Sequence, residues 1–220
     1  MDTKEIGKVK CPYCGKEGDF TFWKVINTSL EPALKAGVRD GSAFLFHCPH
    51  CGEETYVDYS LLYHQPEDKI LINCADTDRG ENEVNRILAG AKADPMLAGI
   101  DQSAYLTRMV ASRSELMEKL AIFDAGLDDR LIELCKLIGA AQYMKDRPDN
   151  SSVTVQFFLS KDGQKCLRLF EDDAHASTMV LHDELYQQVR RTFASGLPSM
   201  RSDIPVIDQN WAVQVMKLLD

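Results

Sequence analysis

The sequence of 220 residues predicts an α+β protein in three parts: a β-rich N-terminal region, a mainly helical middle and a small C-terminal α+β unit. Three observations support this prediction. Short β-prone runs and two C-x-x-C motifs fill residues 8–75. Apolar residues then recur at helical spacing. Finally, an Asp-Gly pair separates two β-prone runs. We therefore divide the chain into residues 1–75, 76–147 and 148–220.

The N-terminal region is predicted to consist of short strands. Aromatic and β-branched residues predict these strands, in chain order, at Asp19–Ile26, Ala43–His47, Thr55–Leu61 and Lys69–Cys74. Between the first two strands, a proline and two glycines leave room for at most a short helix, at Pro32–Ala36.

The middle segment is predicted to pack on the N-terminal region. Glu83–Ala93 has the pattern of a helix, and Tyr105–Val110 fits either a strand or a helix. Ser112 and Glu115 form a capping box for a helix that begins at Arg113. A second helix is expected from near Asp128 to about Lys145. Its apolar stripe is Leu131, Leu134, Cys135 and Ile138.

The C-terminal unit is predicted to be a β-hairpin followed by two helices. Asp162-Gly163 is the expected hairpin turn. The expected elements are strands at Val153–Leu159, Lys165–Phe170 and Thr178–Leu181, a helix at Asp183–Phe193 and a last helix capped by Asp208.

Composition and charge exclude several classes of protein. Hydrophobic residues make up 45% of the chain, which is typical of a globular protein and not of a fibrous or disordered one. No apolar run approaches the roughly 18 residues of a membrane span, and the N-terminus lacks the apolar core of a signal peptide. We therefore expect a soluble cytoplasmic protein. The net charge of −9 disfavours binding to nucleic acid, because it repels phosphates.

The clearest chemical signal is a pair of matching pentapeptides, CPYCG and CPHCG, which contain Cys11, Cys14, Cys48 and Cys51. Each C-x-x-C directs two sulfurs toward one point, and the glycine that follows permits the positive φ of a sharp turn. Four thiolates form the closed tetrahedral shell of structural zinc. The sequence therefore predicts a zinc ribbon with one zinc ion per chain.

Two alternatives use the same cysteines. An iron centre takes the same four sulfurs, and sequence alone separates iron from zinc poorly. A thioredoxin-type redox pair needs its C-x-x-C at the start of a helix, whereas turn-like sequence follows Cys14 and a β-prone run follows Cys51. The odd total of seven cysteines also argues against a disulfide framework. Zinc is thus the favoured interpretation, with iron as the alternative.

The histidines form no recognisable catalytic pattern. His47 and His50 flank the second motif and are interpreted as surface residues or neighbours of the sulfurs. His64 ends a strand-like run, and His182 lies in the C-terminal unit. The sequence contains no motif of a nucleotide-binding loop, a serine hydrolase or a hydrolytic zinc enzyme. A non-enzymatic role is therefore favoured, with an enzyme using His64 or His182 as a remaining alternative.

The sequence resembles the CpXC family of bacterial and archaeal proteins, which is named for its Cys-Pro-X-Cys motif. The resemblance rests on both pentapeptides, on LLYHQPEDKILI and on SELMEKLAIFDAGLDDRLIELCK. It implies that Cys11, Cys14, Cys48 and Cys51 are metal ligands, and it implies no reaction. The family commonly has aspartate after the Tyr-His pair, where this chain has Gln65, and this difference weakens a catalytic role for His64.

Three hypotheses of function follow from the sequence. The first is a prokaryotic zinc-ribbon adaptor that binds a protein partner or self-associates. The second is a nucleic-acid-associated zinc ribbon of transcription or RNA machinery. The third is an enzyme of unrecognised type.

Overall fold

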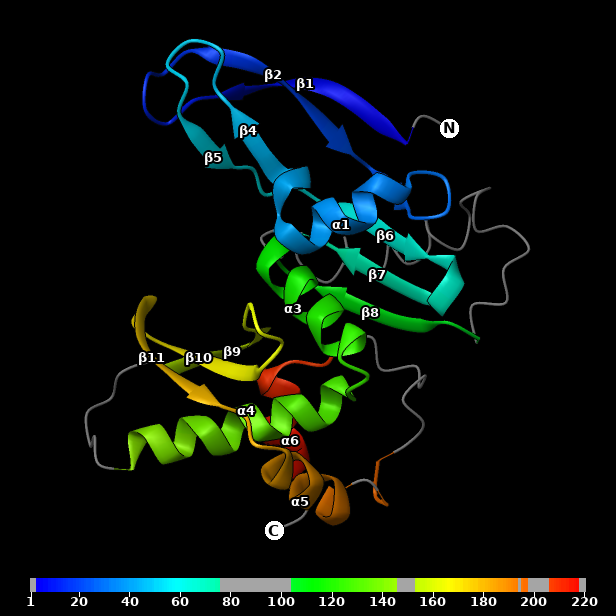
Figure 1. The fold of residues 1–220 in the computed structure, drawn as a ribbon, viewed down its shortest axis with the longest axis vertical. Helices are drawn as coiled ribbons and strands as arrows, with labels where there is room; N and C mark the ends of the chain where they lie inside the picture. The colour runs from blue at the N-terminus through cyan, green and yellow to red at the C-terminus, as the bar shows by residue number, and fades with distance from the viewer. Residues whose placement is uncertain (1–2, 76–103, 146–152, 194, 198–205, 218–220) are drawn as a thin grey trace. The chain divides into compact units, whose positions relative to one another are not determined.

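The computed structural model describes residues 3–75, 104–145, 153–193, 195–197 and 206–217. The chain folds into two compact units, Met1–Met117 and Glu118–Asp220. Figure 1 shows strands and helices in both of them, which confirms the predicted α+β class. The expected helix at Glu83–Ala93 lies outside the described residues.

The first unit contains two hairpins and a four-stranded sheet. Its strands are β1 (Lys4–Lys10), β2 (Glu17–Trp23), β3 (Val25–Asn27), β4 (Leu45–His47), β5 (Glu54–Tyr56), β6 (Leu61–Gln65), β7 (Ile70–Cys74) and β8 (Leu106–Val110). Its helical elements are α1 (Pro32–Asp40) and the short 3-10 helices η1 (Ser42–Phe44) and η2 (Pro66–Asp68). Helix α3 (Arg113–Asp124) begins in this unit and ends in the second.

The two hairpins form the ribbon. Strand β1 pairs antiparallel with β2, and β4 pairs antiparallel with β5. The hairpins lie side by side (Figure 1), and a Cβ atom added to Gly18 of the first would come within 2.8 Å of Phe46 and Pro49 of the second. This close approach explains why a glycine is needed between the hairpins.

The four-stranded sheet has the order β3-β6-β7-β8. Strands β6 and β7 are antiparallel, and each flanking pair is parallel. Every residue of β6 and β7 is buried. Continuous burial of this kind is expected of central strands that are covered on both faces.

Several boundaries in the first unit differ from prediction. The expected strand Asp19–Ile26 is two strands that separate at Lys24 and join different sheets. Strand β1 was not predicted, because its lysines alternate with small and apolar residues and leave a weak β signal. Helix α1 extends to Asp40, where Gly41 ends it with a φ of 84°. Tyr105–Val110, left open between strand and helix, contains strand β8.

The second unit packs helices on a three-stranded antiparallel sheet. Its elements are α4 (Asp129–Met144), β9 (Val153–Leu159), β10 (Lys165–Glu171), β11 (Ala174–Val180), α5 (Asp183–Phe193) and α6 (Gln209–Lys217). The strand order is β11-β10-β9. The hairpin and all three helices lie where the sequence predicts them. Asp208 accepts the expected capping bond at 2.7 Å, and Asp128 accepts a capping bond at the start of α4 at 3.0 Å.

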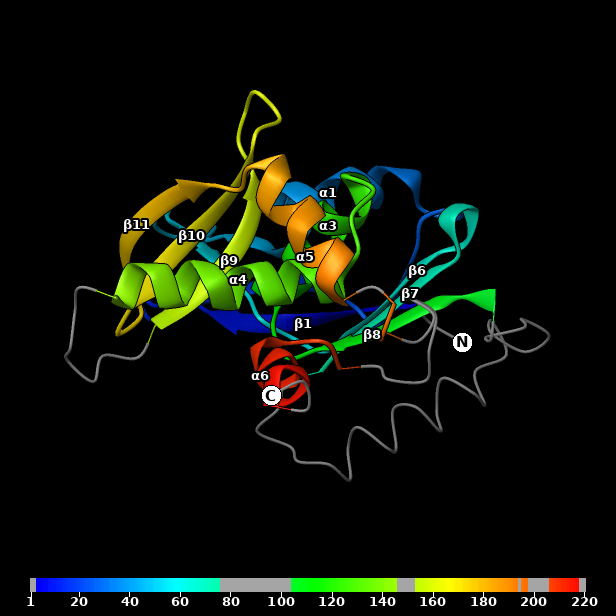
Figure 2. The same ribbon diagram turned by 90° about the horizontal axis from the view of Figure 1, so that it is seen from below.

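Helix α4 is the centre of the second unit. It runs along the sheet (Figure 2), and Gly139 permits its close approach to Leu167 and Met179. Leu131, Leu134 and Cys135 are buried as predicted. Ile138 is 36% exposed, so its placement on the apolar stripe was wrong. Charged residues occupy part of the packed face of α4, so the apolar residues on that face differ from the predicted stripe.

Candidate metal centre

The two C-x-x-C motifs are the turns of the two ribbon hairpins. The first joins β1 to β2, and the second joins β4 to β5. Their backbones match: Gly15 N–H donates to the Cys11 carbonyl at 2.9 Å, and Gly52 N–H donates to the Cys48 carbonyl at 3.0 Å. Both glycines have positive φ, 71° and 77°, which confirms the predicted reason for glycine there.

The four sulfurs meet at one point. All four Sγ atoms lie within 4.8 Å of one another. The Cys11–Cys51 separation is 3.7 Å and the Cys14–Cys48 separation is 3.6 Å. A tetrahedron of sulfurs with Zn–S bonds of 2.3 Å has edges of about 3.8 Å. The arrangement can therefore hold a metal ion.

The closely spaced sulfurs shift the pKa values of Cys48 and Cys51 in opposite directions. Burial opposes ionisation of Cys48, but the backbone N–H groups of His50 and Cys51 outweigh it and lower the pKa to about 6. The backbone of Glu53 favours the Cys51 thiolate, yet burial and the neighbouring sulfurs raise the pKa of Cys51 to about 12. A bound dication would offset this repulsion between like charges.

The CpXC protein family model matches residues 9–136, more than half of the chain. The chain belongs to the CpXC family. The match includes both C-x-x-C turns, which we call the knuckles, together with the four-stranded sheet and the first half of α4. No curated protein and no solved structure matches the chain.

Aromatic side chains pack behind the CpXC knuckles. Cys11 and Cys48 share a small core with Phe20 and Phe46. The ring of Phe20 meets those of Phe22 and Phe46 edge-on at centroid distances of 5.0 and 6.3 Å. Phe20 and Phe46 are buried and serve as the ribbon core.

The histidines near the second knuckle lie outside the sulfur cluster. His47 Nδ1 is 3.0 Å from Glu54 Oε1, and both side chains are exposed. His50 Nε2 is 3.1 Å from the carbonyl of Glu17. Within the described residues, the only group of cysteines, histidines and carboxylates assembled for a metal is the four-cysteine set.

His64 belongs to a buried hydrogen-bond chain in the sheet. Ser29 N–H donates to Asn27 Oδ1, and this bond fixes the orientation of the Asn27 side-chain amide. Asn27 Nδ2 therefore faces His64 Nδ1, at a distance of 3.3 Å. Nδ1 therefore accepts, and Nε2 carries the proton that it donates to the Tyr105 hydroxyl at 3.2 Å. Burial lowers the pKa of His64, with partial opposition from Glu67. The imidazole is thus held neutral and is only 2% exposed. His182 is exposed at the start of α5.

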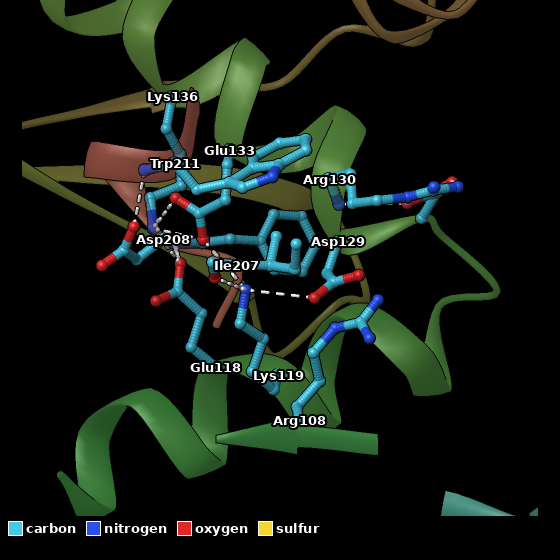
Figure 3. A network of polar contacts seen from close by, with 12 residues as sticks. Arg108, Glu118, Lys119, Asp129, Arg130, Glu133, Lys136, Ile207, Asp208 and Trp211 are labelled. Atoms are coloured by element: carbon cyan, nitrogen blue, oxygen red, sulfur yellow. Dashed lines mark hydrogen bonds and ion pairs between the residues drawn. The ribbon is translucent and has the colours of Figure 1, made fainter. Parts of the chain in front are cut away.

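A buried group of charges in the second unit was missed by sequence reasoning. Figure 3 shows the side chains of Glu118, Lys119, Asp129, Glu133 and Lys136 converging from α3 and α4. All five are at most 6% exposed. Asp129 was interpreted as a residue of the helix start, and its acidic neighbour Asp128 does cap α4. The only signal for this group in the sequence was that charged residues recur at i, i+4 and i, i+3 spacing in α4, which is otherwise mainly apolar.

This charge group joins four segments of the unit. Lys119 Nζ lies 3.1 Å from Glu133 and 3.2 Å from Asp129, and it donates to the Ile207 carbonyl. Phe157 N–H, on the edge strand β9, donates to Glu118 Oε1 at 2.6 Å. Burial raises the pKa of Glu118. The group therefore satisfies buried backbone atoms as well as charges, which indicates a structural role.

Proposed function

We propose that Cys11, Cys14, Cys48 and Cys51 bind one structural zinc ion as thiolates. The observation that carries this proposal is the convergence of four Sγ atoms, with separations of 3.6 and 3.7 Å between paired sulfurs. The donor set also supports it, because soft thiolate ligands select zinc or iron over hard cations such as magnesium and calcium. Iron remains the alternative metal.

A shell of four cysteines has no open position for water or substrate. The zinc would therefore hold the two hairpins together and would not act in hydrolysis. Its thiolate complex would carry a net charge of −2, and backbone N–H groups directed at Cys48 and Cys51 would stabilise that charge.

We further propose that the ribbon binds a protein partner, either another protein or a second copy of the chain. Support comes from two large side chains on the first hairpin. Ile6 on β1 is 76% exposed, and Tyr13 in the first knuckle is 65% exposed. Contact with a partner would remove this apolar surface from water.

The test compares surface variants of the metal-loaded protein. Chemical crosslinking and sedimentation would measure self-association, and crosslinking in a lysate of the native host would measure partner binding. We expect Ile6→Lys with Tyr13→Lys to abolish the association shown by the unchanged protein. Leu30→Lys is the matched control, because Leu30 is 67% exposed but lies outside both hairpins. Absence of any association by the unchanged protein, or equal loss in both variants, would contradict the interaction role.

A further inference from the structure

Each knuckle pairs one protected sulfur with one accessible sulfur. Cys11 and Cys48 are 1% and 3% exposed, whereas Cys51 is exposed and Cys14 is more exposed than Cys11 or Cys48. The pairing between knuckles is crossed. Accessible Cys51 lies 3.7 Å from protected Cys11, and accessible Cys14 lies 3.6 Å from protected Cys48. An oxidant can therefore reach one sulfur of each crossed pair directly.

The other three cysteines provide an internal contrast. Cys74, Cys135 and Cys166 are 3%, 0% and 5% exposed, and each lies in an apolar strand or helix. Burial raises the pKa of Cys135 to about 12. Since oxidants react with accessible thiolates, buried thiols of this kind are expected to be inert.

We propose that the knuckles are an oxidation site at which hydrogen peroxide releases the metal and leaves two crossed disulfides, Cys14–Cys48 and Cys11–Cys51. The proposal rests on the proposed zinc site, since it concerns the ligands of that ion. It adds a reactant class, the hydroperoxides, and it assigns different roles to the sulfurs. Cys14 and Cys51 are oxidised first, and Cys48 and Cys11 then attack the oxidised sulfurs to form the disulfides.

The chemistry balances with peroxide as the sole oxidant. The Cys14 thiolate attacks one peroxide oxygen, so that an S–O bond forms, the O–O bond breaks and hydroxide leaves. The Cys48 thiolate then attacks the Cys14 sulfur, an S–S bond forms, and the second oxygen leaves as hydroxide. Each disulfide thus consumes one peroxide and two electrons from sulfur. The second crossed pair reacts in the same way, and the zinc then has no thiolate ligand.

The crossed connectivity joins the sulfurs that contact each other between the two hairpins. A disulfide needs its sulfurs about 2 Å apart, and the crossed pairs must close from 3.6 and 3.7 Å. The resolving thiolate of each crossed pair is already adjacent to the sulfur that the oxidant reaches. Both disulfides would also join one hairpin to the other, so the hairpins would stay connected after the metal leaves.

The experiment treats the full-length, metal-loaded protein with a tenfold excess of hydrogen peroxide. A colorimetric chelator measures released zinc, intact mass measures oxidation, and peptide mapping of the alkylated protein locates the disulfides. We expect release of one zinc ion per chain, a loss of four of the seven thiols and a mass decrease of about 4 Da, all reversed by dithiothreitol. Cys135→Ala is the control and should release zinc to the same extent.

Several results would overturn the proposal. Zinc could stay bound with all seven thiols intact, the buried cysteines could oxidise before the knuckles, or the disulfides could form within each C-x-x-C motif. Irreversible oxidation of the knuckle sulfurs to sulfinic acid would also contradict it. A preparation that binds no metal at all would overturn the zinc function and this proposal together, whereas zinc that resists peroxide would overturn only this proposal.

Discussion

The ribbon and the second unit achieve stability by different means. The ribbon buries few side chains, centred on Phe20 and Phe46, and brings four cysteine sulfurs together. The second unit has a large apolar core around α4 and a buried group of paired charges. A small scaffold without a sufficient core commonly needs a metal or a covalent link. The comparison therefore predicts that the metal controls the ribbon and leaves the second unit folded.

The chain offers a separate reporter for each unit. It contains two tryptophans, Trp23 at the end of β2 and Trp211 in α6. Fluorescence of Trp211 in a Trp23→Phe background follows the second unit, and the reciprocal variant follows the first.

Loss of the metal should have the largest effect. Structural zinc contributes about 10–16 kcal/mol in zinc-finger peptides, so Cys48→Ser should unfold the ribbon. Trp23 fluorescence should report the change, and the Trp211 transition should stay in place. Cys166→Ala is the control, because Cys166 lies in β10 of the second unit and is not one of the four knuckle cysteines. The same unfolding transition for Trp23 before and after metal removal would refute the metal-dependent ribbon.

Breaking the buried charge group should have the next effect, confined to the second unit. Lys136→Met removes the ammonium that lies 2.9 Å from Glu118 and 3.0 Å from Glu133. Removing one partner of a buried ion pair costs about 3–5 kcal/mol, because the remaining charge is uncompensated. Urea unfolding followed by Trp211 would measure this loss.

The matched control for that prediction is the exposed pair of Lys165 and Asp183. Their atoms are 2.7 Å apart, with side chains 30% and 72% exposed. Lys165→Met should therefore cost under about 1 kcal/mol. Similar losses for Lys136→Met and Lys165→Met would show that the buried group contributes no more than a surface ion pair.

Close packing between the hairpins predicts a smaller effect. In Gly18→Ala, the new methyl group would lie 2.8 Å from Phe46 and Pro49 and would push the hairpins apart. Overpacking of this kind costs about 1–3 kcal/mol. The stability of the ribbon, followed by Trp23 fluorescence, and its affinity for zinc should both decrease. Gly196→Ala is the control, because its nearest neighbour is a carbonyl at 3.7 Å; an unchanged zinc affinity in Gly18→Ala would contradict the packing argument.

The neutral His64 predicts a pH dependence in the first unit. Its folded pKa is lowered by burial, so the unfolded chain binds the proton more readily. The stability contributed by the neutral His64 is fully present above the unfolded pKa of about 6.5 and is lost as the pH falls below it. Unfolding followed by Trp23 should show a loss of stability as the pH falls from 6.5 to 5.5, at most about 1 kcal/mol, that His64→Gln lacks. Parallel pH profiles for the two proteins would contradict a neutral, buried imidazole.

The sequence predicted features that depend on local spacing. The knuckle glycines, the Asp208 cap and the Asp-Gly hairpin each follow from a few adjacent residues, and each is present. The four cysteines were also singled out in advance, because the motif repeats with the same turn chemistry. The resemblance to the CpXC family drew on these same residues and on the segments around them.

Features that depend on distant contacts were not predicted. The break at Lys24 moves the chain from the ribbon to another sheet, and only pairing with β6 shows it. The buried position of Glu133 depends on Lys119, which is 14 residues away in α3. Charges on a helix normally indicate a solvated face, so their burial appears only when the opposing charges are known.

Whether the four cysteines hold one zinc ion is tested most directly by a native mass spectrum of the protein expressed without added metal. The account predicts one zinc per chain with all seven thiols reduced. Iron would contradict the assignment of zinc. A metal-free chain lighter by two hydrogens for each cysteine pair would contradict the metal site itself.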